Sequence, residues 1–368
     1  MKDAETVTVE QAIARLGSYD AILDARSPSE YALDHVPGAI SAPVLDDAQR
    51  AEVGTLYKQA GTFEAKRVGA AIVARNIADV VERELADAPR DWRLLVYCWR
   101  GGNRSGALAT VLARIGWRTE ILEGGYRAFR RHVLAELEQL PSTLRFIVIA
   151  GRTGSGKSLL LERLQAQGAQ VLDLERLASH RGSVLGHLPQ QPQPSQKHFE
   201  TSIWEQLRGF DPGRPVIVES ESRKVGQCQV PASLILAMRA SPCLRVEASD
   251  AVRCRLLLSE YRHFVEEPER LAQRLEALVG HHGRARIDAW LASARAGNWP
   301  EFVLALLHEH YDPAYDRSMK RNFSALDQSP AVRLDSAEPG ALDAAASELL
   351  ALAAARASPA KSRPITPD

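Results

Sequence analysis

Two glycine-rich loops carry the residues whose types and spacing could do chemistry. The first runs from Cys98 to Ser105 with the sequence CWRGGNRS, directly after the apolar run Leu94–Tyr97 and before a helical pattern. A cysteine at the carboxyl end of a strand, before a helix, lies among backbone amides that bind anions and lower the pKa of a thiol. This segment therefore predicts a thiolate nucleophile in an anion-binding loop.

The other residues of this loop fit the same chemistry. Arg100 and Arg104 add positive charge beside Cys98. Gly101 and Gly102, followed by Ser105, let the backbone curl around a tetrahedral anion. A single cysteine is more often a buried structural residue, but the surrounding glycines and arginines favour the nucleophile.

The second loop, Gly151–Ser158, has the sequence GRTGSGKS and matches the phosphate-binding pattern GxxxxGK[ST] in full. It follows the apolar run Phe146–Ala150 and opens the predicted helix Ser158–Gln167, which is the context that a P-loop requires. Lys157 is expected to bridge phosphate oxygens and Ser158 to hold Mg²⁺. The predicted phosphate-contacting residues are Gly151, Gly154, Ser155, Gly156, Lys157 and Ser158. A P-loop most often binds ATP or GTP, so a nucleotide remains the alternative ligand.

Two acidic residues follow the apolar run Pro215–Glu219. Glu219 ends this run and Glu221 comes two residues later. Carboxylates at the end of a strand that neighbours a P-loop can lie near its metal ion. Strands also often end in solvated carboxylates, which is the alternative interpretation.

The pattern around these loops predicts an α/β protein of two main domains. Short apolar runs alternate with helical patterns, which is typical of parallel sheets. Proline at 141 is expected to end the helix Phe129–Leu140. We therefore predict an N-terminal parallel α/β domain over 1–138 and a P-loop NTPase-like α/β domain over 139–323, with a helical, lid-like part at about 231–310. A short helix, Ala341–Ala355, and a disordered tail are expected within 324–368.

Composition limits the class of protein. The 368 residues contain 46 Lys+Arg and 46 Asp+Glu, so the net charge is zero, and 45% are hydrophobic. Of the basic residues 38 are arginine, the residue suited to bidentate phosphate recognition. The segment 97–132 has a local excess of positive charge, which predicts either a tRNA contact or a solvated helix face. The candidate tRNA-binding residues are Arg114, Arg118, Arg127, Arg130 and Arg131.

Four cysteines without metal-ligand spacing indicate free thiols in a reducing compartment. The N-terminus has no signal-peptide pattern, and no apolar run approaches the roughly 18 residues of a membrane helix. We expect a cytoplasmic protein without a membrane partner, and the pattern leaves its oligomeric state undetermined.

The first third of the chain resembles the rhodanese family. The resemblance rests on Asp24–Tyr31 (DARSPSEY), His35–Ile40 (HVPGAI) and the cysteine loop. The spacing C-x5-R-S exceeds that of ordinary sulfurtransferases by one residue and equals that of rhodanese-fold phosphatases. The wider loop suits a phosphate or a selenophosphate better than thiosulfate.

The whole order of motifs resembles the bacterial tRNA 2-selenouridine synthase family. Besides the two loops, four segments carry the resemblance: Val53–Lys58 (VGTLYK), Glu123–Arg130 (EGGYRAFR), Ala178–Ser183 (ASHRGS) and Gln193–Glu200 (QPSQKHFE). The resemblance implies a transferase that acts on the wobble 2-thiouridine of tRNA. It implies transfer of a geranyl group from geranyl diphosphate to sulfur, then replacement of the geranylthio group by selenium from selenophosphate, which another protein must supply.

These implied tasks divide between the two loops. The P-loop and Mg²⁺ would bind the diphosphate of geranyl diphosphate, while Cys98, between Arg100 and Arg104, would take up selenium or position selenophosphate. Three alternatives remain. They are a rhodanese-fold phosphatase or sulfurtransferase, a P-loop kinase or NTPase with a regulatory rhodanese module, and a protein that only delivers sulfur or selenium.

Overall fold

The computed structural model describes residues 3–323 and 326–357, and it divides into two compact units. Unit 1 contains Met1–Glu136 together with Glu200–Trp204, and unit 2 contains Leu137–Phe199 and Glu205–Asp368. Within the described residues no helix is long and apolar enough to span a membrane.

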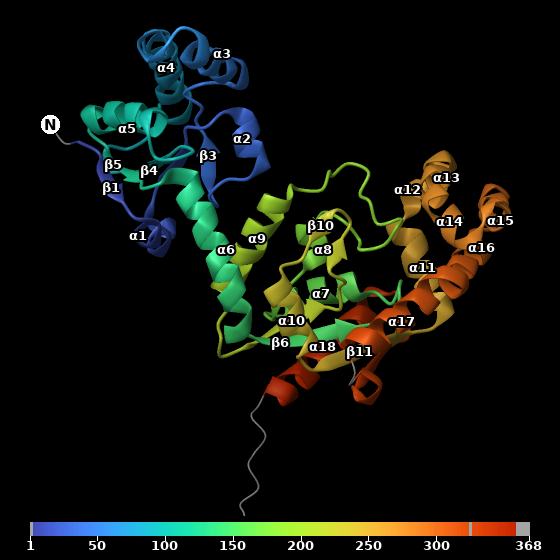
Figure 1. The fold of residues 1–368 in the computed structure, drawn as a ribbon. Coiled ribbons are helices and arrows are strands. Elements are labelled where there is room, and N and C mark those ends of the chain that lie inside the picture. The colour runs from blue at the N-terminus through green and yellow to red at the C-terminus, as the bar shows by residue number, and fades with distance from the viewer. Residues whose placement is uncertain (1–2, 324–325, 358–368) are drawn as a thin grey trace, which may run out of the picture. The chain divides into compact units, whose positions relative to one another are not determined.

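Unit 1 is built on a five-stranded, fully parallel sheet in the order β1-β5-β4-β2-β3. Its strands are β1 Glu5–Val7, β2 Ala21–Asp24, β3 Ala39–Ser41, β4 Arg93–Tyr97 and β5 Arg118–Leu122 (Figure 1). Its helices are α1 Val9–Ala14, α2 Pro28–Leu33, α3 Asp47–Gln59, α4 Thr62–Glu84, α5 Asn103–Ile115 and α6 Gly125–Thr143. The central strand β4 is apolar at four of its five positions and buried there, as a strand covered on both faces must be.

Unit 2 is built on a second parallel sheet in the order β12-β11-β6-β8-β7. Its sheet strands are β6 Arg145–Ala150, β7 Gln170–Leu172, β8 Pro215–Glu219, β11 Cys243–Ala248 and β12 Ala331–Leu334. A separate two-stranded ribbon consists of β9 Lys224–Val225 and β10 Cys228–Gln229.

The helices of unit 2 fall into two groups. The first group is α7 Lys157–Ala166, α8 Leu174–Leu177, α10 Ala232–Arg239 and α18 Pro339–Ala357, together with α9 Gln196–Gly209, of which Glu200–Trp204 belong to unit 1. The helical part, with its own apolar core, comprises α11 Asp250–Glu260, α12 Arg262–Glu266, α13 Pro268–Leu275, α14 Val279–His282, α15 Arg284–Arg295, α16 Trp299–Leu306, a π-helical turn Leu307–Tyr311 and α17 Asp312–Asn322.

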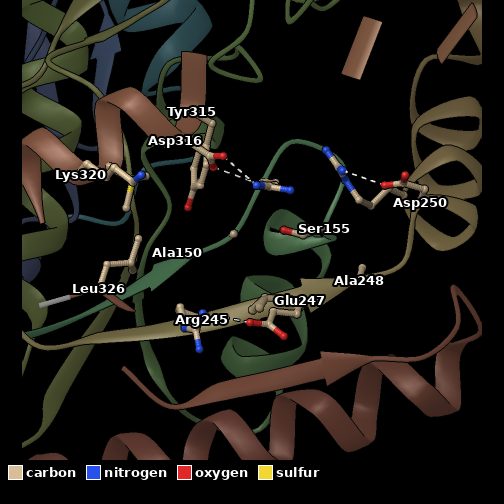
Figure 2. A pocket seen from close by; sticks show the side chains of 15 residues that line it. Ala150, Ser155, Arg245, Glu247, Ala248, Asp250, Tyr315, Asp316, Lys320 and Leu326 are labelled. Atoms are coloured by element: carbon tan, nitrogen blue, oxygen red, sulfur yellow. Dashed lines mark hydrogen bonds and ion pairs between the residues drawn. The ribbon is translucent and has the colours of Figure 1, made fainter. Parts of the chain in front are cut away.

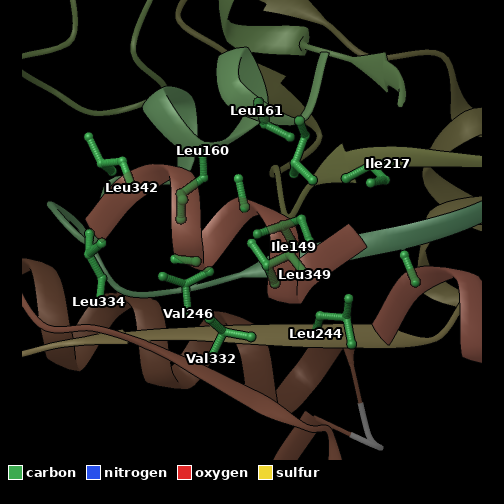
Figure 3. Close-up of a cluster of buried hydrophobic side chains, with 14 of the residues drawn as sticks. Ile149, Leu160, Leu161, Ile217, Leu244, Val246, Val332, Leu334, Leu342 and Leu349 are labelled. Atoms are coloured by element: carbon green, nitrogen blue, oxygen red, sulfur yellow. The ribbon is translucent and has the colours of Figure 1, made fainter. Parts of the chain in front are cut away.

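The core of the unit 2 sheet lies under α7 and α18 (Figure 3). Leu160 from α7 and Leu349 from α18 are fully buried together with Ile149 of β6. Val332 of β12 belongs to the same core and is also fully buried. The β12–α18 segment is thus an integral part of the P-loop domain, and the expected boundary at 324 is wrong. A four-residue strand followed by an alanine-rich helix gave too weak an apolar signal to be assigned to the sheet.

Proline 141 does not end its helix, contrary to the expectation from the sequence, because α6 continues to Thr143. Proline lacks the N–H that would bond the carbonyl of Leu137 four residues earlier. The hydroxyl of Ser233 donates to that carbonyl at 2.6 Å and replaces the missing bond. The compact units divide close by, between Glu136 and Leu137. Residues 358–368 of the predicted disordered tail lie outside the described part of the chain.

Candidate functional site

Cys98 lies at the carboxyl end of β4, and its side chain is 4% exposed. Its Sγ is 3.2 Å from the hydroxyl oxygen of Ser105. Burial raises the pKa of the thiol. The Ser105 hydroxyl and the backbone N–H groups of Ser105, Arg100 and Gly102 lower it by more, so the net shift is downward. The loop therefore favours the thiolate, which is the nucleophilic form of cysteine.

A second cysteine shows what burial alone does. Cys243 is also 4% exposed, and burial raises its pKa to about 11. Burial raises the pKa values of Cys228 and Cys254 as well. All four cysteines are free. The opposite shift at Cys98 therefore comes from the hydrogen-bond donors of its loop.

The two predicted arginines of this loop differ in their surroundings. Arg104 donates to the carboxylate of Glu30 at 2.7 Å. Burial raises the pKa of Glu30, but the hydrogen bond from Arg104 and its charge lower it by more, so Glu30 is ionised. Arg100 is exposed and lines the cavity in front of the loop. Arg100 is thus the arginine whose charge is available to a bound anion, while Arg104 is held by Glu30.

The backbone of the cysteine loop is fixed by close packing against Gly125. The N–H of Tyr126 donates to the carbonyl of Cys98 at 2.8 Å. Gly125 has a φ of +57°, and a Cβ at this position would overlap the carbonyl oxygen of Cys98 and come within 2.6 Å of the Gly101 nitrogen. No structural role for Glu123–Arg130 was predicted from its sequence, although its glycine pair indicated a tight backbone approach.

A cavity of about 760 Å³ opens in front of the cysteine loop. The loop forms one side with Cys98, Trp99 and Arg100, and helices α3 and α4 form the other with Val53 and Gly69 among their lining residues. The cavity is large enough for a nucleobase or a phosphate ester in front of the thiol.

The predicted tRNA-binding arginines have different surroundings in unit 1. Arg118, Arg127 and Arg131 are exposed. Arg114 is also exposed and pairs with Asp3 at 2.7 Å. Arg130 is half-buried and forms an ion pair with Glu200. Its guanidinium is thereby occupied within unit 1, which leaves the other four as the candidate phosphate contacts.

The P-loop connects β6 to α7 and has the backbone that its glycines allow. Gly154 and Gly156 have φ values of +79° and +82°, in the left-handed region that favours glycine. A Cβ at Gly151 would lie 2.5 Å from the hydroxyl oxygen of Ser155. Lys157 donates to the Gly151 carbonyl at 2.7 Å and lines a cavity of about 350 Å³ over the loop.

Three glutamates gather beside the P-loop. Glu175 accepts a hydrogen bond from the Ser158 hydroxyl at 3.0 Å, and its backbone N–H donates to Glu219 at 3.0 Å. Glu221 lines the P-loop cavity together with Glu175. Glu219 and Glu221 were expected here from the sequence, whereas Glu175 was not. Glu175 follows strand β7, and β7 pairs with β8, the strand that ends in Glu219. A carboxylate just after a strand next to β8 was the pattern that could have predicted Glu175.

Burial strongly disfavours charge in this cluster, which we call the acidic cluster (Asp173, Glu175, Glu219 and Glu221). Burial, and then the charge of Glu221, raise the pKa of Glu175 to about 8. Burial likewise raises the pKa values of Asp173, Glu219 and Glu221. One oxygen of Glu219 has no hydrogen-bond partner among the described residues. The charge of Lys157 lowers the pKa values of Glu175 and Glu221, but by less than burial raises them.

These oxygen donors fit a hard cation. Mg²⁺ is bound by one or two carboxylates together with water and substrate phosphate oxygens, and not by a cage of protein ligands. In the described part of the chain no three His, Cys, Asp or Glu side chains form a metal cage. The unpartnered oxygen of Glu219, the carboxylate of Glu221 and the hydroxyl of Ser158 match the Mg²⁺ pattern, with phosphate oxygens supplying the remaining ligands.

Three residues of the Ala178–Ser183 motif, Arg181, Gly182 and Ser183, also line the P-loop cavity. Arg181 lines it, and its guanidinium lies 5.0 Å from the ring centre of Tyr261. Gly182 has a φ of +64°, and a Cβ there would lie 2.7 Å from Glu175 and 3.0 Å from Glu221. The motif therefore brings a cation to the cavity and lets the backbone approach the carboxylates closely.

A charged cavity of about 500 Å³ adjoins the first turn of the P-loop (Figure 2). Arg245 pairs with Glu247 at 3.1 Å, and Asp316 accepts from Arg152 at 2.7 Å. Arg253 is buried, and its guanidinium donates to the Thr153 carbonyl at 2.9 Å and pairs with Asp312. It anchors the P-loop to the helical part.

Comparison with known proteins adds two matches to family models. Residues 8–132 match the rhodanese-like domain, and residues 144–281 match the model described as the tRNA 2-selenouridine synthase AAA domain. The two ranges fall on the two compact units and include both loops.

Curated relatives match over most of the chain. The tRNA 2-selenouridine synthase of a Sulfurovum species is 30% identical over 333 residues, which cover 83% of this chain and 90% of the relative. That of Alcanivorax borkumensis is 32% identical over 82% of this chain and 90% of the relative. That of Cupriavidus necator is 34% identical over 80% of this chain and 87% of the relative.

Proposed function

This chain belongs to the tRNA 2-selenouridine synthase family, and we propose that it converts the wobble 2-thiouridine of tRNA to 2-selenouridine in two steps. Unit 2 transfers a geranyl group from geranyl diphosphate to the sulfur. Unit 1 supplies selenium from selenophosphate, which replaces the geranylthio group. The observation that carries this proposal is the presence of two different anion sites, one in each unit, for two phosphorus-containing substrates.

In the first step the sulfur of 2-thiouridine attacks C1 of geranyl diphosphate, and the N3 proton of the base passes to water. The bond between C1 and the diphosphate oxygen breaks, and its electron pair leaves with the diphosphate. The P-loop amides and Lys157 face the charge that develops on this leaving group, which is where a preorganised site lowers the barrier most. Mg²⁺ held by Ser158 and the acidic cluster would neutralise part of the same charge.

In the second step the Cys98 thiolate attacks the phosphorus of selenophosphate. The P–Se bond breaks and its electron pair stays on selenium, which is released as selenide. Selenide adds to C2 of the geranylated uridine, and geranylthiolate leaves. Water then hydrolyses the S-phosphocysteine to phosphate and regenerates the thiol. Each selenium atom remains at the selenide oxidation level, so this sequence needs no oxidant or reductant.

The loop around Cys98 suits this role. Its inward N–H groups already stabilise one negative charge, and Arg100 offers another cation at the cavity. Alkylation in the first step makes the sulfur a better leaving group than a thiocarbonyl sulfur. The order of the two steps follows from that chemistry.

A purified-component assay tests the proposal. An anticodon stem-loop carrying 2-thiouridine is incubated with the protein and geranyl diphosphate, then with selenophosphate, and its nucleosides are analysed by mass spectrometry. We expect the geranylated nucleoside first and 2-selenouridine second. Turnover of ATP or of an aryl phosphate without any change in the RNA would support the kinase or phosphatase alternative instead.

A further inference from the structure

A largely apolar hollow in the helical part of unit 2 adjoins the P-loop cavity. Aromatic and aliphatic side chains of α11, α12, α16 and the π-helical turn line it. The buried apolar residues that line it include Phe264, Leu271, Phe302, Val303, Leu306 and Leu307. Among the residues that the structure describes, none with a charged side chain lines this hollow, in contrast to the paired arginines and acids of the cavity in Figure 2.

The hollow and the phosphate cavity share part of their lining. Five residues line both cavities: Thr153, Ser183, Leu257, Tyr261 and Tyr311. Thr153 belongs to the P-loop itself. A Cβ at Gly154 would lie 2.8 Å from the side chain of Leu257, so the phosphate loop packs directly on the wall of the hollow.

The shared residues separate a polar side from an apolar side. The hydroxyl groups of Ser183 and Tyr261 are 3.4 Å apart, and Arg181 lies over the Tyr261 ring. Arg181 lines the phosphate cavity, whereas Phe264 stacks nearly parallel to Tyr261 at 6.0 Å on the apolar side. A ligand that spans this boundary must carry phosphate at one end and hydrocarbon at the other.

We infer that this hollow, the tail pocket, binds the hydrocarbon chain of a short prenyl diphosphate whose diphosphate lies on the P-loop. The inference rests on the proposed function and assigns the tail to unit 2. The volume of the hollow is about 50 Å³. At about 10–15 Å³ for each water-sized position, this equals roughly four waters, or one five-carbon isoprenoid unit. The first unit of a geranyl chain then lies among the shared residues, and the second fills the tail pocket.

The chain-length preference of two variants tests this assignment. Phe302 is 5% exposed and Val303 is 8% exposed, and both line the tail pocket. Phe302→Ala should enlarge the pocket, and Val303→Phe should fill it. Ile287→Val is the matched control, because Ile287 is fully buried in the same apolar core and does not line the pocket. Dimethylallyl, geranyl and farnesyl diphosphates serve as donors of 5, 10 and 15 carbons.

We expect Phe302→Ala to raise the ratio of kcat/KM for farnesyl over geranyl diphosphate at least tenfold. Val303→Phe should lower kcat/KM for geranyl diphosphate at least tenfold and that for dimethylallyl diphosphate much less, since a hydrophobic pocket discriminates single carbons by about 10–200-fold. The inhibition constant of inorganic diphosphate should stay within twofold in all three variants, which also shows that the P-loop is folded.

The outcomes separate this inference from the proposed function. A wild-type protein that alkylates RNA with none of the three donors overturns the proposed function. A wild-type protein that uses geranyl diphosphate, with unchanged chain-length ratios in Phe302→Ala and Val303→Phe, overturns the tail pocket alone. A change of equal size in Ile287→Val would show a general packing effect and would likewise overturn it.

Discussion

Burial disfavours charge at both anion sites of this chain, but only one of them compensates with its own donors. At Cys98 the hydroxyl of Ser105 and three backbone N–H groups outweigh burial, and the pKa falls. In the acidic cluster burial and mutual repulsion dominate, and the pKa of Glu175 rises to about 8. The rhodanese-like unit thus stabilises the Cys98 thiolate with its own donors, whereas the acidic cluster of the P-loop unit needs a bound cation to stabilise its ionised form.

This difference assigns the two units different chemistry. A stabilised thiolate is a nucleophile and needs no further partner. A P-loop beside protonated carboxylates becomes an active site only when a phosphate ligand and the metal ion that accompanies it bind there. Each of the following predictions disturbs one unit and leaves the other as the reference.

The largest expected effect is that of Cys98→Ser. A serine hydroxyl is not ionised near neutral pH, so the nucleophile of the second step is lost. We expect selenouridine formation to fall at least about 10³-fold, while geranylation stays within twofold. Time courses of both nucleosides by mass spectrometry measure this. Full conversion to selenouridine by Cys98→Ser would remove the assigned role.

Lys157→Ala should have the next largest effect, in the opposite unit. Removal of one preorganised cation from the leaving group costs about 10²–10³-fold in rate. We expect that loss in geranylation. Lys197→Ala, a change at a lysine outside the P-loop, is the control. Geranylation at the wild-type rate by Lys157→Ala would disprove the P-loop assignment.

Gly125→Ala should disturb the cysteine loop through its backbone. The added Cβ meets the carbonyl of Cys98, and the φ of +57° is unfavourable for alanine. We expect the free energy of unfolding of unit 1 to fall by about 2 kcal/mol. Urea denaturation measures it. Gly106→Ala is the control, because its Cβ meets nothing within 4 Å and α5 is helical there. Equal stabilities for the two variants would contradict this account of the loop.

The smallest expected effect is a change in the pH dependence of stability in Glu175→Gln. The pKa of Glu175 is about 8 in the folded chain, above its usual value of 4.5. Between these values the folded state retains a proton that the unfolded state has lost, so stability falls as pH rises. Without Mg²⁺ and diphosphate, Glu175→Gln should weaken this fall, by of order 1 kcal/mol at pH 8.5.

Thermal denaturation from pH 5 to 8.5 measures this effect. Glu348→Gln, at an exposed position on α18, is the control and should follow the wild type. A wild-type stability that rises over this pH range, or the same curve for both variants, would show that Glu175 is not protonated in the folded chain.

The sequence was sufficient to predict the two α/β domains and the positions of both loops. Strands such as Pro215–Glu219 are continuous apolar runs, and parallel strands buried on both faces must have this pattern. The sheet strands that escaped prediction are β1, β3, β11 and β12. Three of them, β1, β3 and β12, have three or four residues and lie at the edges of their sheets, whereas β11, Cys243–Ala248, is an interior strand within 231–310, where the prediction of a helical part was wrong. Short edge strands carry little periodic signal, so their position depends on tertiary pairing.

The residues of the loops were predictable from local spacing, but their partners were not. Arg104 lies six residues after Cys98, yet its ion pair is with Glu30, 74 residues away. Glu175 and Gly182 reach the P-loop only because β7 lies next to β8. Contacts of this kind depend on the order of strands in the sheet, which no local pattern specifies.

The division of labour between the two units is tested most directly with RNA that is already geranylated. A chemically prepared stem-loop carrying S-geranyl-2-thiouridine is supplied with selenophosphate to Lys157→Ala and to Cys98→Ser, and selenouridine is measured by mass spectrometry. We predict that Lys157→Ala converts this RNA at a rate within twofold of wild type and that Cys98→Ser leaves it unchanged. Conversion by Cys98→Ser, or a block in Lys157→Ala, would contradict the assignment of the two steps to separate units.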